Sequence, residues 1–168
     1  DIESHAIERA FGLMADNLPN VPDLVALVDI DHNQTTLYIA KNGEFIYSRE
    51  QLFGGAQLTD AIQNRYGLSA EEATISKRER TLPDDYYPEV LTPFIENTIQ
   101  QITRSLQFYF SSSQYSSIDH VVLAGGSSSI AGLAGMAQQR LGVPVTIANP
   151  FINMTIAPHI DNEQLAID

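Results

Sequence analysis

Two short segments carry residue types and spacings that suit a phosphorylated ligand. The first is residues 29–36 (DIDHNQTT), a polar turn between two apolar stretches. A carboxylate such as Asp29 at the end of a strand can orient a hydrated metal ion or a water. Turn amides and the hydroxyls of Thr35 and Thr36 can bind phosphate oxygens. An ordinary polar turn would have the same composition, because Asp and Asn tolerate turn geometry.

The second segment, residues 121–127 (VVLAGGS), joins an apolar strand to a double glycine. A helix is predicted to follow from about Ile130, so its first free amides would point at the turn. Gly125 and Gly126 would let a ligand approach the backbone closely, and Ser127 adds a hydroxyl. A tight strand-to-helix turn that needs no ligand fits the same residues, so both interpretations stay open at this point.

Other kinds of site find little support in the sequence. Asp29, Asp31 and Asn33 match the first ligands of a calcium loop, but Gln34 stands where that loop needs glycine and Ala40 where it needs glutamate. The chain has no cysteine, its four histidines are far apart, and it lacks the P-loop and nucleophile-elbow motifs. We therefore assign no metal ligand and no catalytic residue.

Composition narrows the class of partner. The 168 residues include 9 Lys and Arg against 21 Asp and Glu, a net charge of −12. This balance argues against nucleic acid and against an anionic membrane surface, because both attract cations. The hydrophobic fraction of 43% supports a real core. No apolar run approaches the roughly 20 residues of a membrane helix. Because the sequence begins with Asp1, we expect a piece of a longer protein.

Hydrophobic periodicity predicts an α/β domain. Strands are predicted at residues 24–30, 35–41, 44–49, 120–124 and 143–147. The first three should form an antiparallel meander, because Asn42-Gly43 favours a tight hairpin turn. Helices are predicted at residues 3–16, 56–66, about 69–78, about 88–110 and 130–140, with loops at 79–88 and 111–117 and no clear period after 148. A mixed sheet with helices on its faces accommodates this order in one domain, residues 1–168.

The two ligand-holding segments, in this order and separated by helices, resemble the second half of the actin-like (ribonuclease-H-like) ATPase superfamily. Further motifs are similar to the PilM family of type IV pilus assembly proteins. They are YSRE at 47–50, FGG at 53–55, YGLS at 66–69, EEA at 71–73 and NPF at 149–151. The resemblance covers nearly the whole chain and implies a small inserted subdomain, a helical lobe at about residues 67–92.

The resemblance also implies roles for individual residues. Asp29 would lie on the phosphate side of an ATP cleft and act through magnesium or water, with Thr35 and Thr36 nearby. Gly125, Gly126 and Ser127 would line the adenosine side. Lys77 and Arg78 would lie on the helix that flanks adenine and ribose. This stretch alone would form one wall of the cleft, with little ATP affinity of its own.

The implied function is a cytoplasmic scaffold at the inner membrane of a bacterium. It would recruit the cytoplasmic tail of the membrane-anchored pilus protein PilN, for pilus assembly and twitching motility. Two departures from the family weaken the nucleotide site. Asp31 replaces a turn glycine and adds negative charge, and Thr74 stands where a ribose-binding Glu is usual. Alternatives are an active ATPase, at most a weak one, and a cell-division or cell-shape actin homologue. An isolated half could also dimerise through its exposed face.

Overall fold

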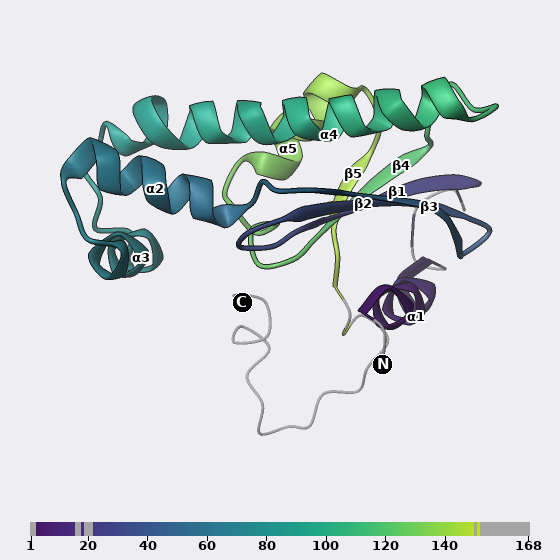
Figure 1. The fold of residues 1–168 in the computed structure, drawn as a ribbon, viewed down its shortest axis with the longest axis horizontal. Coiled ribbons are helices and arrows are strands. Elements are labelled where there is room, and N and C mark those ends of the chain that lie inside the picture. The colour runs from purple at the N-terminus through teal and green to yellow at the C-terminus, as the bar shows by residue number, and fades with distance from the viewer. Residues whose placement is uncertain (1–2, 16–17, 19–21, 150, 152–168) are drawn as a thin grey trace.

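A five-stranded mixed sheet organises the chain in the computed structural model, which describes residues 3–15, 18, 22–149 and 151 (Figure 1). The strands lie in the order β3-β2-β1-β4-β5. Their bounds are β1 Leu24–Ile30, β2 Thr35–Lys41, β3 Glu44–Gln51, β4 His120–Ala124 and β5 Val145–Ile147. The first three strands form the predicted antiparallel meander, and β4 and β5 add to it in parallel. The α/β class with a mixed sheet is thus confirmed.

The hairpin between β2 and β3 has the turn that its sequence predicts. Asn42 and Gly43 adopt φ angles of 51° and 84°, and both are in the left-handed region that tight hairpins require. The central strand β1 is buried along nearly its whole length, because β2 and β4 flank it and helices cover both faces of the sheet. Strand β3 at the edge alternates between exposed and partly buried residues instead.

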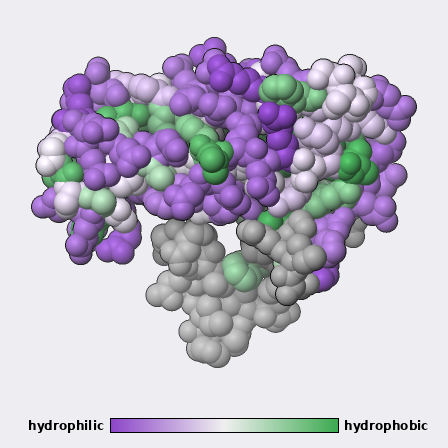
Figure 2. All heavy atoms as spheres, viewed as in Figure 1, coloured by the Kyte–Doolittle hydropathy of each residue, from purple (hydrophilic) through white to green (hydrophobic). Residues whose placement is uncertain are grey.

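Helices lie on both faces of the sheet (Figure 1). Their bounds are α1 Glu3–Ala15, α2 Gly55–Tyr66, α3 Ala70–Glu79, α4 Thr92–Ser112 and α5 Leu133–Leu141. The larger core lies between the sheet and α2, α4 and α5, and it includes Ile39, Ile62 and Leu123. The smaller core lies on the opposite face, where Phe11 of α1 packs among residues of β1, β2 and β4. Hydrophilic residues cover most of the face seen in Figure 2.

The long helix begins differently from the prediction of a single helix from Pro88. One π-helical turn, η1 (Tyr87–Leu91), precedes α4, and the Thr92 amide donates to the Tyr87 carbonyl. Pro93 in the first turn of α4 explains this start, because proline has no amide to continue the ordinary helical pattern. This turn lies against α2 and places Tyr87 at the pocket described below.

Other boundaries also differ from the predictions. Strand β3 ends at Gln51 rather than 49. Helix α4 continues through Ser112, because the hydroxyls of Ser111 and Ser112 donate to the Phe108 carbonyl and satisfy the last turn. Helix α5 begins at Leu133 rather than 130, after a left-handed Gly132. Strand β5 begins at Val145, because Pro144 cannot donate to a ladder. The tail from 152 onward and Pro150 of the NPF motif lie outside the described residues.

Candidate functional site

The two predicted ligand-holding segments meet at one edge of the sheet. Strands β1 and β4 are parallel neighbours, with Asp29 opposite Ala124, so their carboxyl ends lie side by side. A Cβ atom placed on Gly125 would stand 2.6 Å from both Asp29 Oδ1 and the Ile30 carbonyl oxygen. Gly125 also has a φ of 81°. Glycine is therefore required here, both by the backbone conformation and by the close approach of Asp29.

The turn after β4 does not offer the free helix amides that the sequence predicted, because α5 starts later. The Ser127 amide donates to the Ile30 carbonyl (3.0 Å) and the Ser128 amide to the Gly125 carbonyl (3.0 Å). These bonds fix the turn against the end of β1. Gly126 is exposed, and a Cβ atom there would meet nothing within 4 Å. A ligand can therefore approach the backbone closely at Gly126.

The turn between β1 and β2 is held by the start of α2. The amides of Gly55 and Ala56 donate to the carbonyls of Asp31 (2.8 Å) and His32 (2.7 Å). A Cβ atom on Gly54 would stand 2.3 Å from the Asp31 carbonyl oxygen, so this close packing requires glycine. A Cβ atom on Gly55 would stand 2.6 Å from Ser127 Oγ of the turn after β4. The β1–β2 turn, the turn after β4 and the start of α2 therefore pack closely together at one corner.

Thr35 and Thr36 lie at this corner but are largely covered. Each is 6% exposed. The Thr35 hydroxyl donates to the Phe53 carbonyl at 2.6 Å, and Thr36 is paired with Asp29 across the β1–β2 ladder. The structure therefore gives Thr35 a structural hydrogen bond. A phosphate contact by either hydroxyl stays a prediction.

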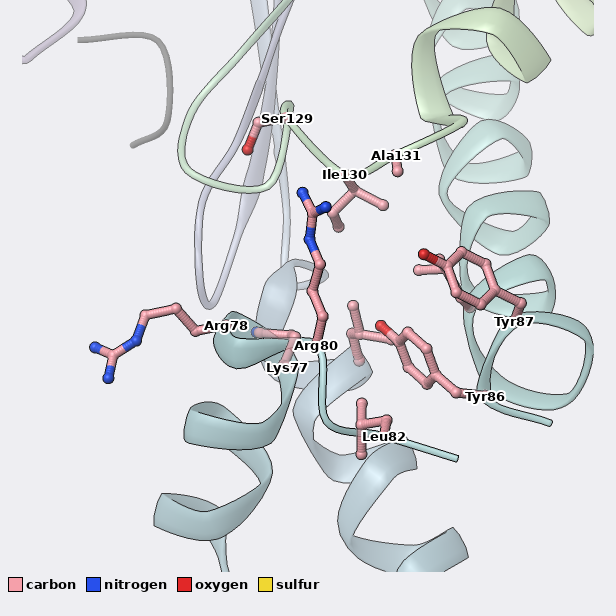
Figure 3. Close-up of a pocket in the computed structure, with 11 residues that line it drawn as sticks. Lys77, Arg78, Arg80, Leu82, Tyr86, Tyr87, Ser129, Ile130 and Ala131 are labelled. Atoms are coloured by element: carbon pink, nitrogen blue, oxygen red, sulfur yellow. The ribbon is translucent and has the colours of Figure 1, made fainter. Parts of the chain in front are cut away.

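A pocket of about 380 Å³ opens beside this corner, between α2, α3, η1 and the turn that follows β4 (Figure 3). It is lined by cationic, aromatic and apolar side chains. They belong to Leu58, Lys77, Arg78, Arg80, Leu82, Tyr86, Tyr87, Leu91, Ser129, Ile130 and Ala131. The volume lies within the range of small-ligand sites.

Helix α3 positions the predicted residues Lys77 and Arg78 at this pocket. Its first turn is closed by a capping box, in which the Ser69 hydroxyl and the Glu72 carboxylate each bond to the other's backbone amide. Lys77 is partly buried and donates to the Thr59 hydroxyl at 3.3 Å. Burial lowers the pKa of Lys77. The Arg78 side chain is 77% exposed and extends away from the other labelled side chains in Figure 3.

Two tyrosines form the wall opposite α3. Tyr86 is partly buried, and burial raises its pKa to about 12, so its hydroxyl stays protonated and can donate. Tyr87 is 57% exposed. The preceding residue Asp85 accepts hydrogen bonds from Arg65 (2.8 Å) and Tyr66 (3.0 Å) at the end of α2. These bonds lower the pKa of Asp85 and tie the tyrosine wall to α2.

Sequence reasoning missed most of this pocket. It placed the tyrosines in an exposed loop. It grouped Arg80 with Lys77 and Arg78 as a basic cluster, which could meet phosphate or an acidic partner or be a solvated helix end, but did not include Arg80 in the nucleotide site. The available signal was the pair of consecutive tyrosines between two prolines, in residues 83–88, because adjacent aromatic side chains can form an apolar patch that marks a binding site. Among the described residues there is no group of three or more His, Cys, Asp or Glu side chains that could hold a metal ion. In the same residues no helix is long and apolar enough to cross a membrane.

Comparison with solved structures identifies the architecture. The chain superposes on a PilM–PilN type IV pilus biogenesis complex with a TM-score of 0.78 and 25% identity, over 95% of this chain and 46% of that one. It also matches the ethanolamine utilisation protein EutJ of Carboxydothermus hydrogenoformans (TM-score 0.62, 20% identity, 86% and 51% covered). MreB5 of Spiroplasma citri, solved with AMPPNP, gives a TM-score of 0.58 (15% identity, 84% and 53% covered). The actin-like fold is thereby shown.

The chain spans about half the length of these solved relatives. A family profile described as "Type IV pilus assembly protein PilM" matches residues 1–168, the whole of the sequence. The motifs that suggested this family therefore indicated it correctly. The chain belongs to the PilM family of type IV pilus assembly proteins, and it corresponds to the C-terminal half of the solved relative.

Proposed function

We propose that this chain forms one wall of an ATP-binding cleft in an actin-like scaffold for type IV pilus assembly. The observation that carries the cleft is the convergence of three distant segments. The end of β1 and the Gly125 turn meet at one corner. Residues 129–131, just beyond that turn, line the pocket together with α3, whereas Asp29, Gly125 and Gly126 are not among the pocket's lining residues. This is an arrangement in which phosphates and a nucleoside can lie side by side, Asp29 at one end and Lys77 at the other.

The residues present fit a nucleotide with magnesium. Gly125 has no side chain that would cover Asp29, and Gly126 is open to a ligand backbone contact. Proteins commonly hold Mg²⁺ by one or two carboxylates together with substrate phosphates, so a cluster of three protein ligands is not needed. Bound magnesium would supply charge neutralisation between Asp29, Asp31 and the phosphates. Lys77 would bind on the nucleoside side, and Arg78 would have to turn its exposed side chain toward the pocket to join it.

The proposed partner is the cytoplasmic tail of a PilN-type membrane protein. Family membership and similarity to a chain solved in a PilM–PilN complex support this assignment. The scaffold would then work in the cytoplasm, at the inner face of the bacterial membrane. The net charge of −12 favours a protein partner over direct contact with an anionic lipid surface.

Calorimetric titration of the full-length protein with Mg-ATP tests the cleft, with Asp29→Ala as the variant. We expect micromolar binding, about −8 kcal/mol, that weakens in the variant. Equal binding by both proteins would contradict the role of Asp29. A synthetic PilN tail tests the partner in a separate titration, and failure of the full-length protein to bind it would overturn the scaffold assignment.

An active ATPase is the second candidate. The position of the partly exposed Asp29 near the carboxyl end of β1 favours it, because a carboxylate there can orient an attacking water. Asp31 opposes it, because a second carboxylate repels the phosphates. ATP hydrolysis faster in the wild type than in Asp29→Ala would support the ATPase. Filament formation with nucleotide, measured by light scattering, would instead favour a cell-shape or cell-division homologue.

A further inference from the structure

Arg80 has a backbone conformation that its residue type does not favour. It ends α3 with a φ of 56°, in the left-handed region, and its amide donates to the Ser76 carbonyl. Helices α2 and α5 end in the same way, but with Gly67 and Gly142 in that position. Glycine is the usual residue there because it has no Cβ atom to strain the turn. An arginine in its place calls for a reason outside the helix.

The left-handed turn aims the Arg80 side chain into the pocket. Figure 3 shows the side chain running from the end of α3 across to Ile130, with Tyr86 and Tyr87 on the other side of the space. The tyrosine hydroxyls point toward that space. Strained backbone in folded proteins is concentrated at ligand clamps, where the surrounding structure maintains it. Arg80 thus lies across the pocket from the two tyrosines.

The pocket is cationic in an acidic protein. Three of the nine Lys and Arg residues of the chain, Lys77, Arg78 and Arg80, line it. Among the described residues, neither Lys77 nor Arg80 forms an ion pair, and Arg78 has only its neighbour Glu79 at 3.9 Å. Elsewhere Arg65 and Arg140 are paired with carboxylates. Lys77 and Arg80 therefore carry positive charges at the pocket that no carboxylate among the described residues neutralises.

We propose that Arg80 is a specificity residue of this pocket, which stacks its planar guanidinium on the purine ring of a nucleotide against the wall of Tyr86 and Tyr87. Guanidinium groups pack favourably on the faces of aromatic rings, which an ammonium group does less well because it is compact and strongly hydrated. The assignment rests on the proposed nucleotide cleft. It adds Arg80 to the predicted nucleotide-binding residues Lys77 and Arg78, and it gives the two tyrosines a role.

The left-handed turn makes an unusually clean test possible. Arg80→Gly removes the side chain and relieves the backbone, so the variant should be at least as heat-stable as the wild type. We expect its affinity for Mg-ATP in the full-length protein to fall about 3- to 30-fold, the range of a cation–π contact. Arg80→Lys keeps the positive charge but replaces the planar guanidinium with an ammonium group, so its affinity for Mg-ATP should stay below that of the wild type.

Asn42→Gly is the matched control. Asn42 is the other described non-glycine residue at positive φ, and it lies in the hairpin between β2 and β3, outside the pocket. The Asn42→Gly variant should bind Mg-ATP with the affinity of the wild type. Wild-type affinity in Arg80→Gly, or full recovery in Arg80→Lys, would overturn the stacking role while leaving the cleft in place. Absence of Mg-ATP binding by the wild type would overturn the cleft and this inference together.

Discussion

The carboxylate of Asp29 packs directly against the bare Cα of Gly125. A Cβ atom at Gly125 would stand 2.6 Å from Asp29 Oδ1, closer than real side chains approach. The contact joins β1 to the turn after β4, two segments nearly a hundred residues apart in the chain. The acid of one motif and the glycine of the other are therefore parts of a single structural unit.

Gly125→Ala should destabilise the fold. The methyl group would meet Asp29 and the Ile30 carbonyl, and alanine strains a φ of 81°. We expect a loss of about 1–3 kcal/mol in the free energy of unfolding, measured by urea denaturation. Gly126→Ala is the control, because nothing lies within 4 Å of its Cβ position. An equal loss in both variants would show that the close approach is not the cause.

The N-terminal cap of α3 should stabilise the helix that carries Lys77 and Arg78. Ser69 accepts from the Glu72 amide, and its own amide donates to the Glu72 carboxylate at 2.8 Å. Ser69→Ala should cost about 1 kcal/mol and lower the melting temperature by about 2–4 °C. Glu72→Gln should cost less, because glutamine also closes a capping box. If Ser69→Ala melts like the wild type, the cap does not stabilise α3.

The partly buried Lys77 should lower the free energy of unfolding of the ligand-free protein. Burial lowers the pKa of its folded form below 10.5, so the unfolded chain binds the proton more tightly. Stability should therefore rise as pH increases from the folded pKa toward 10.5. Lys77→Met should stabilise the ligand-free protein at pH 7, and this gain should shrink as pH approaches 10.5. Urea denaturation at both pH values checks this, and a gain independent of pH would contradict it.

Local patterns predicted the sheet well. Strands β1 and β2 match their predicted bounds, and the Asn42-Gly43 turn has the φ angles that its residue types favour. These elements depend on nearest neighbours and on burial of both faces, which leave a direct record in the residue pattern. The π-helical start at Tyr87 could not be predicted from the local pattern, because it depends on Pro93 several residues later.

The candidate site was predicted in part. Asp29 and the glycine turn come together because parallel strands end at the same edge. The pocket depends instead on where α3 ends and on the Asp85 contacts that hold the tyrosines, which are tertiary features. The left-handed Arg80 could not be predicted, because glycine, not arginine, is the sequence signal for such a turn.

Acid should weaken the protein through His120 at the start of β4. The residue is 1% exposed, one ring nitrogen lies 3.0 Å from the Thr146 hydroxyl, and burial lowers the pKa of the ring below 6.5. The unfolded chain therefore takes up a proton first as pH falls. The free energy of unfolding should decrease below about pH 6.5 and level off once the folded form is also protonated.

Urea denaturation between pH 7.5 and about pH 5 measures this effect. His120→Gln should flatten the pH dependence, because glutamine can still bond to Thr146 and does not titrate. His5→Gln is the matched control, because His5 is exposed on α1 and should leave the pH dependence in place. If His120→Gln keeps the full loss of stability on acidification, the titrating group lies elsewhere, and β4 is not the acid-sensitive element of the sheet.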